Sequence, residues 1–286
     1  MGLFLAWSAF YGACLFPGLG GELNAGDSAK FQILGHTPIL VHGPGYPMVL
    51  MIGSALRALS LPPPAWWTLT FTLAAVPGAV ANSVAFLIAH RLTGSLLLGI
   101  AAALVLGSAG LMAVQSTEAE VYALALAFVL TTVYLLVLFV ETGRAGFFLA
   151  ACAVYALSFG NHLMMIMLVP LLVWITLLRR AVTLQPRRVA MAAIFIALGA
   201  SQYLYLAHAA YDPATSYSEY MPLPPQPMEL VRYVLGTYFN ALYESGLGDP
   251  SRVRALYGTL WFAHPWLSVP LTAAGLALFA AGWRRR

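Results

Sequence analysis

Long apolar stretches separated by short polar ones make up most of the chain. A helix that crosses a bilayer takes roughly 20 apolar residues, and eight stretches approach this length. The predicted spans cover residues 3–19, 66–89, 95–114, 121–140, 146–159, 163–178, 189–207 and 260–283. The pattern therefore predicts an all-α polytopic membrane protein that forms a single domain over residues 1–286.

One further apolar segment, residues 47–61, is predicted not to cross the membrane. Arg57 interrupts it and three consecutive prolines follow it, so we interpret it as an interfacial or re-entrant helix. With the N-terminus in the cytoplasm, the inner loops then carry nine of the 14 Lys and Arg residues and the outer segments carry five. This agrees with the basic excess of cytoplasmic loops. We expect both termini in the cytoplasm, and long outer segments at about residues 20–65 and 208–258.

Composition supports the membrane assignment and excludes a soluble protein. Hydrophobic residues make up 61% of the chain and charged residues 8%, whereas an average soluble domain has about 25% charged residues. The net charge of +4 reflects the basic inner loops, so we expect no nucleic-acid partner. The two cysteines lie in apolar stretches without disulfide or metal spacing. Nine of the ten acidic residues fall on the outer side, which makes the outer face the expected working face.

The first outer segment is the polar island of the N-terminal half. Residues 21–47 are predicted to form a loop rich in Gly and Pro, and they include Asp27, Lys30 and His42. Ionisable residues in a loop beside a membrane are candidates for catalysis or binding.

Two short outer segments add further candidates. At residues 115–122 a helix is predicted to begin, and Ser116 or Thr117 could cap it with two carboxylates in its first turn. That capping role is the structural alternative to a functional one. Residues 158–162 join two apolar helices through a Gly-Asn-His turn, which is either a simple turn at headgroup level or part of a site.

The long outer segment contains a predicted amphipathic helix at residues 228–243, because its apolar positions recur every three or four residues. This helix is either a packing lid or a cover that binds the acceptor.

Five short motifs, in order along residues 21–243, resemble one family of membrane proteins. They are Asp27-Ser28-x-x-Phe31 with Leu34-Gly35, His42-x-Pro44-Gly45-Tyr46-Pro47, Ala119-Glu120-Val121-Tyr122, Leu157-Ser158-x-x-Asn161-His162, and Tyr203-Leu204-Tyr205-Leu206 with Asp212-Pro213. The family has bacterial and eukaryotic members and was long known only as a domain of unknown function. Its eukaryotic member is a transmembrane protein O-mannosyltransferase of the endoplasmic reticulum.

This family is similar to the GT-C glycosyltransferases, which transfer a sugar from a polyprenyl- or dolichyl-phosphate carrier at the outer or lumenal face. The resemblance implies a GT-C-like bundle of about eight transmembrane helices, inversion at the anomeric carbon, and a place in a bacterial inner membrane. Two positions depart from the family pattern: Lys30 stands where a Glu is usual, and Gly43 stands where a Pro is usual.

The residues can be given roles that fit such a transfer. Asp27 suits the general base, and Glu120 could orient the acceptor or assist a divalent ion. If a metal takes part, Asp27 and Glu120 are the expected oxygen ligands. Residues expected to bind the donor phosphate or the substrate are Lys30, His42, Tyr46, Asn161, His162 and Arg232. Tyr46 and Trp66 could lie at headgroup level against the sugar or the isoprenoid.

The expected partners are the lipid bilayer, a lipid-linked sugar donor and a protein or glycan acceptor. Two other functions stay open. One is a non-catalytic accessory member of the same family, which the Lys30 substitution allows. The other is a transporter or flippase, although this class usually places ionisable groups near mid-membrane and the predicted spans contain almost none.

Overall fold

The computed structural model describes residues 1–22, 25–59, 65–216 and 221–237, and these ranges are helical without strands. The helices are α1 (Gly2–Ala13), α2 (Ala25–Ile33), α3 (Pro47–Ala58), α4 (Ala65–Thr70), α5 (Val76–Thr93), α6 (Leu96–Gly107), α7 (Gly110–Gln115), α8 (Tyr122–Thr142), α9 (Ala145–Leu157), α10 (Val169–Leu178), α11 (Arg180–Thr183), α12 (Pro186–Tyr211) and α13 (Pro227–Val234). Short irregular helices cover Phe71–Ala75, Ser158–Gly160 and Leu163–Leu168. The predicted span at 260–283 lies outside the described residues.

Three helices in the described ranges are long and apolar enough to cross a membrane: Trp67–Thr93, Tyr122–Thr142 and Pro186–Tyr211. They confirm three of the predicted spans. The other apolar segments form shorter helices of 10–17 residues. The predicted span at 95–114 is broken at Ser108 and Ala109 into α6 and α7, a backbone interruption that summed hydropathy does not detect.

The longest span contains a π-helical turn, Phe71–Ala75, immediately before α5. Pro77 lies at the start of α5, and proline has no backbone N–H to continue the regular helical ladder. The chain stays helical across this point, and the Val76 backbone N–H donates to the Phe71 carbonyl across the wider turn.

Two tight hairpins join the helices at one end of the bundle. Gly94 and Gly143 adopt positive φ angles of 69° and 67°, which end α5 and α8 in the left-handed conformation that glycine tolerates best. Beside them, the Arg91 Nε atom lies 2.6 Å from the Glu141 Oε2 atom, so an ion pair connects the two hairpins.

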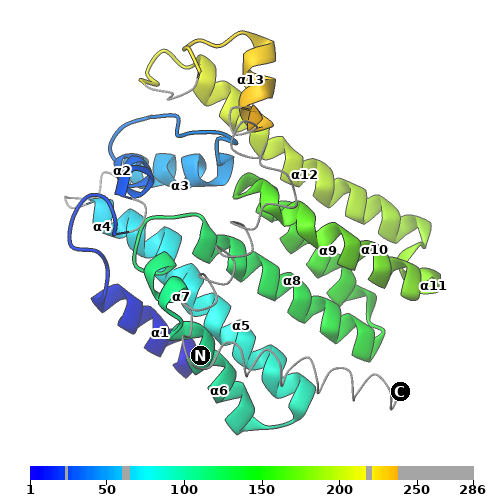
Figure 1. Cartoon of the computed structure of the whole chain (residues 1–286). Coiled ribbons are helices and arrows are strands. Elements are labelled where there is room, and N and C mark those ends of the chain that lie inside the picture. The colour runs from blue at the N-terminus through cyan, green and yellow to red at the C-terminus, as the bar shows by residue number, and fades with distance from the viewer. Residues whose placement is uncertain (23–24, 60–64, 217–220, 238–286) are drawn as a thin grey trace, which may run out of the picture.

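Helix α5 packs against α1, α6 and α8, and α9 packs against α8 and α12 (Figure 1). The approach of α9 to α12 is close at Gly199, where a Cβ atom would overlap the Ala156 carbonyl oxygen. Small residues at helix crossings permit such backbone approach within a membrane.

Segments far apart in the sequence meet at the end of the bundle opposite the hairpins, which we call the α2–α3 end (Figure 1). Their buried side chains form one core: Phe31, Leu34, Leu40, Val41, Tyr46, Val49, Leu50, Leu69, Leu73, Ala119, Val121, Leu206, Ala210, Met221 and Tyr233. Helix α13 docks here because Tyr233 is fully buried and its hydroxyl donates to the Val41 carbonyl. The core holds together the segments that were predicted to lie at the outer face.

Three local predictions were wrong. Residues 21–47 are not all loop, since α2 lies within them. Ser116 and Thr117 do not cap a helix: α8 begins at Tyr122, after Val121, with no side-chain cap. An amphipathic helix was predicted at 228–243, but the observed helix, α13, ends at Val234. Leu235 forms its C-cap and Gly236 has a φ of 65°. Residues 238–243 lie outside the described ranges.

Candidate functional site

Asp27 lies on α2 with two potential cations around its carboxylate. Its Oδ1 atom is 3.5 Å from the Lys30 Nζ atom, one helical turn away, and 3.6 Å from the His42 Nδ1 atom. Lys30 and Asp27 share a helix face because residues three apart are neighbours on its surface. The Asp27 side chain is 43% exposed, so a substrate can reach the carboxylate.

Tyr46 orients His42. The Tyr46 hydroxyl lies 3.0 Å from His42 Nε2, and the two rings meet edge to face with centroids 5.3 Å apart. Burial raises the pKa of the Tyr46 phenol, so the hydroxyl keeps its proton and can donate it to Nε2. The Nδ1 atom on the other side of the ring faces the carboxylate of Asp27.

The backbone at Tyr46 is strained. Its φ of 45° lies in the left-handed region, and no other non-glycine residue in the described ranges has a positive φ. Such a conformation costs on the order of 1–3 kcal/mol. The buried ring offsets this cost by packing edge to face on Phe31, with centroids 5.4 Å apart. Strain of this kind concentrates at functional sites.

His162 approaches the same ring from another segment. Its centroid is 5.8 Å from that of Tyr46 and 5.7 Å from that of Tyr122. Its Nδ1 atom accepts a hydrogen bond from the Met164 backbone N–H at 3.0 Å. Burial, and secondarily the charge of His42, lower the pKa of His162. The neutral ring therefore carries its proton on Nε2, which is left as a donor.

Glu120 is a buried acid beside this group, with 3% of its surface exposed. Burial raises its pKa to about 8, the charges of Asp27 and Glu118 add to this effect, and a hydrogen bond from the Val121 N–H opposes it. Glu120 is consequently protonated at neutral pH. The Asp27 side chain is partly exposed, whereas the Glu120 carboxyl is buried.

Sequence reasoning did not place Glu118 in the site. Glu118 is 2% exposed, and its Oε1 atom accepts the Glu22 backbone N–H at 2.5 Å. A Cβ atom at Gly21 would overlap the Glu118 carboxylate, so the glycine permits this approach. Glu118 ties the segment before α2 to the segment before α8. The available sequence signals were its position in the polar segment 115–122 and Gly21 at the start of the polar island.

Gln32 was also missed. Its side chain is fully buried, accepts the Gly20 N–H at 2.7 Å, and donates to the Gly18 carbonyl at 3.2 Å and the Thr70 hydroxyl at 3.0 Å. These bonds fix α2 against α4, and α2 carries Asp27.

The remaining predicted residues lie at different distances from this group. Asn161 is 1% exposed and donates from Nδ2 to the Val121 carbonyl at 3.0 Å, which fixes the turn before His162 against the segment that holds Glu120. Arg232 lies on the exposed side of α13 and makes no side-chain hydrogen bond or ion pair within the described ranges. The Trp66 side chain lies outside the described part.

The described residues do not favour a metal centre. No group of three His, Cys, Asp or Glu side chains in them could hold an ion. We therefore derive no step through a metal.

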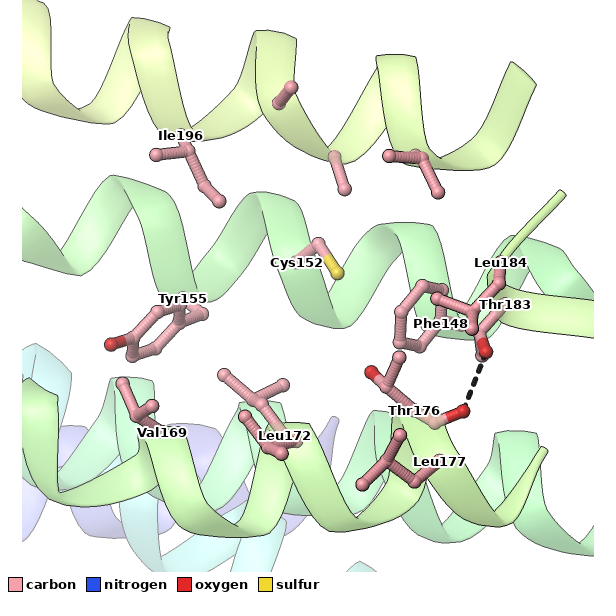
Figure 2. Close-up of a pocket in the computed structure, with 14 residues that line it drawn as sticks. Phe148, Cys152, Tyr155, Val169, Leu172, Thr176, Leu177, Thr183, Leu184 and Ile196 are labelled. Carbon is pink, nitrogen blue, oxygen red and sulfur yellow. Dashed lines mark hydrogen bonds between the residues drawn. The ribbon is translucent and has the colours of Figure 1, made fainter. Parts of the chain in front are cut away.

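Two apolar pockets lie among the helices. One, of about 280 Å³, is formed by α6, α7 and α8 and is lined by Leu106, Ala109, Leu111, Met112, Gln115, Tyr122, Ala123 and Leu126. The other, of about 430 Å³, lies between α9, α10 and α12. Figure 2 shows Cys152 and Tyr155 on α9 facing this second pocket, with Leu172 and Ile196 on the helices either side. The first pocket includes Tyr122, whose ring contacts that of His162.

The comparisons with known proteins agree with the motifs. A family model described as the protein O-mannosyl-transferase TMEM260 N-terminal domain matches residues 27–185, which is more than half of the chain. The match begins at Asp27 and includes Glu120 and His162; the motif at 203–213 lies beyond it. Neither the search of curated proteins nor that of solved structures gave a match. The chain belongs to the family of the protein O-mannosyl-transferase TMEM260 N-terminal domain.

Proposed function

We propose that the chain is a GT-C type glycosyltransferase that moves a sugar from a polyprenyl-phosphate carrier to an acceptor hydroxyl at the outer face of a bacterial inner membrane, with inversion. The observation that carries this proposal is the reachable Asp27 carboxylate, held within 3.6 Å of two nitrogen groups, Lys30 and His42. Family membership supports the transferase class.

In the proposed reaction the acceptor oxygen attacks the anomeric carbon from the face opposite the phosphate. The bond between that carbon and the phosphate oxygen breaks, and the polyprenyl phosphate leaves with the electron pair. Asp27 takes the proton of the acceptor hydroxyl, as a general base must. Because the leaving group is already a phosphate, no strong acid is needed.

The negative charge that grows on the phosphate needs donors that are already in position. The Lys30 ammonium and the Nε2–H of His162 are suited to this task. The protonated carboxyl of Glu120 is a further donor, directed at the acceptor or at the sugar. His42, held between Asp27 and Tyr46, keeps the base in place, and Asn161 supports the turn that carries His162.

The isoprenoid tail of the donor would lie in the pocket formed by α6, α7 and α8. Tyr122 lines this pocket and contacts His162 with ring centroids 5.7 Å apart, so a chain in the pocket leads to the proposed phosphate site. We assign the tail to the first pocket for this reason.

The test is a transfer assay with the purified protein, a set of polyprenyl-phosphate sugars and hydroxyl acceptors. Asp27→Asn should lower turnover by about 100- to 10,000-fold. Glu22→Gln is the matched control, because Glu22 is an exposed carboxylate of the same segment and should keep full turnover. Equal turnover of Asp27→Asn and wild type would remove Asp27 as the base.

One observation favours the accessory function as a second candidate. Lys30 replaces the usual Glu and lies 3.5 Å from Asp27, so the second carboxylate usual in this motif is missing. Absence of turnover with every donor, in wild type and in Lys30→Glu alike, would support this function. A transporter is less consistent with the site, since Asp27, Glu118 and Glu120 lie at one end of the helices rather than along the spans.

A further inference from the structure

A separate cavity of about 200 Å³ lies between α3, the segment after α2, and the C-terminal end of α12. It shares no residue with the group around Asp27. Its lining is mixed in character and comprises Leu34, Pro38, Ile39, Leu50, Ser54, Arg57, Tyr205, His208, Ala209, Asp212 and Thr215. Since one water molecule occupies roughly 30 Å³, the cavity has room for a group of several atoms.

Arg57 provides a fixed positive charge in this cavity. Its Nη1 atom donates to the Leu34 carbonyl at 2.6 Å and to the Thr37 carbonyl at 3.4 Å. A guanidinium has five N–H donors, so donors remain for a ligand. Arginine is well suited to phosphate, because its planar fork matches two phosphate oxygens.

Asp212 provides the opposite charge from α12. Its Oδ1 atom accepts the Ala214 backbone N–H at 2.9 Å, which fixes the carboxylate at the helix end. In the described part of the chain Asp212 and Arg57 line the same cavity but form no ion pair with each other. Two fixed and separated charges of opposite sign are complementary to one ligand that carries both.

The face of α12 that reaches this cavity continues as an apolar surface. Ile194, Leu198, Tyr205 and Asp212 fall on one side of the helix, at spacings of four and seven residues. Ile194 is 51% exposed and Leu198 is 61% exposed, and α12 is one of the candidate spans. A lipid chain can therefore lie along α12 below the cavity.

We propose that this cavity binds the headgroup of a phosphatidylethanolamine lipid. The phosphate lies at Arg57, and the primary ammonium lies at Asp212 and the neighbouring hydroxyl of Thr215. One acyl chain follows Ile194 and Leu198. A headgroup with both charges fits better than an anionic one, which would leave Asp212 facing a phosphate without compensation.

The test measures lipids that stay bound to the full-length protein. Wild type is reconstituted in nanodiscs with equal amounts of phosphatidylethanolamine, phosphatidylglycerol and phosphatidylcholine. The protein is then released from the nanodiscs, and native mass spectrometry identifies the lipids that stay bound to it. Phosphatidylethanolamine should be retained about ten-fold more than either of the other two lipids. This ratio corresponds to a difference of about 1.4 kcal/mol in binding free energy. Arg57→Gln and Asp212→Asn should each abolish this preference. Arg144→Gln is the control, an exposed arginine of the opposite hairpin, and should retain it.

The controls separate binding from folding. Asp212→Asn keeps an oxygen for the Ala214 N–H, so its fold is expected to survive. Ser54→Leu fills the cavity without changing charge and should also abolish the preference. Equal retention of the three lipids by wild type would overturn the proposal. So would an unchanged preference in Ser54→Leu, or in both Arg57→Gln and Asp212→Asn. None of these readouts depends on sugar transfer.

Discussion

The protonated state of Glu120 predicts how the stability of the protein depends on pH. The carboxyl has a pKa of about 8 in the folded protein, against an ordinary value of 4.5. Between these two values the folded state holds a proton that the unfolded state has released. The free energy of unfolding therefore falls as pH rises from 4.5 to about 8, and above 8 it stays at its lower value.

The structure sets the size of this effect. One pKa unit corresponds to about 1.4 kcal/mol, so the difference between 4.5 and about 8 is worth at most about 5 kcal/mol. In a chain of this length each kcal/mol shifts the melting temperature by about 2 °C. Glu120→Gln keeps the shape of the neutral acid and cannot ionise. It should match wild type near pH 5 and melt at higher temperature than wild type at pH 8.5, by up to about 10 °C.

The assay is thermal unfolding of the purified protein in detergent, followed by circular dichroism at several pH values from 5 to 8.5. Glu118→Gln is the matched control two residues away. It leaves Glu120 able to ionise but removes a charge that raises the Glu120 pKa, so the alkaline loss of stability should persist, be smaller, and level off at a lower pH. If Glu120→Gln keeps the full pH dependence of wild type, Glu120 is not the buried acid responsible.

Two other substitutions test the site and the packing. Lys30→Met should lower turnover about 100- to 1000-fold at saturating donor without changing the melting temperature, because it removes a donor to the leaving phosphate; unchanged or increased turnover would contradict that role. Gly199→Ala should lower the free energy of unfolding by about 1–3 kcal/mol, since its Cβ atom would overlap the Ala156 carbonyl. Gly146→Ala meets nothing within 4 Å and should be neutral by comparison; equal effects of the two would refute the close approach of α9 and α12.

Several features of the fold could be read from hydrophobicity because a bilayer allows few solutions. A long apolar run must satisfy its own backbone hydrogen bonds, and the helix does so within one segment. The spans at 66–89, 121–140 and 189–207 were predicted on this ground and are present as long helices. The break at Ser108 was not predictable in this way, because it depends on backbone geometry rather than on summed hydropathy.

The polar residues of the site were noticeable because the chain has so few. Asp27, His42 and His162 stood out, and the motifs around them indicated the family that the comparison confirms. Their partners were not predictable. Whether Lys30 and His42 both reach Asp27 depends on α2, which was expected to be loop, and on Tyr46 in its left-handed conformation.

The sequence alone determined that this is a helical membrane protein of the O-mannosyl-transferase-related family, because hydropathy and short motifs are properties of neighbouring residues. Only the tertiary structure decided that Glu118 and Glu120 precede α8 rather than lie in its first turn, and that both are buried. It also left Arg232 on an exposed helix face and placed Arg57 and Asp212 on one cavity. Burial and charge pairing depend on segments far apart in the chain, and these meet only when the helices pack.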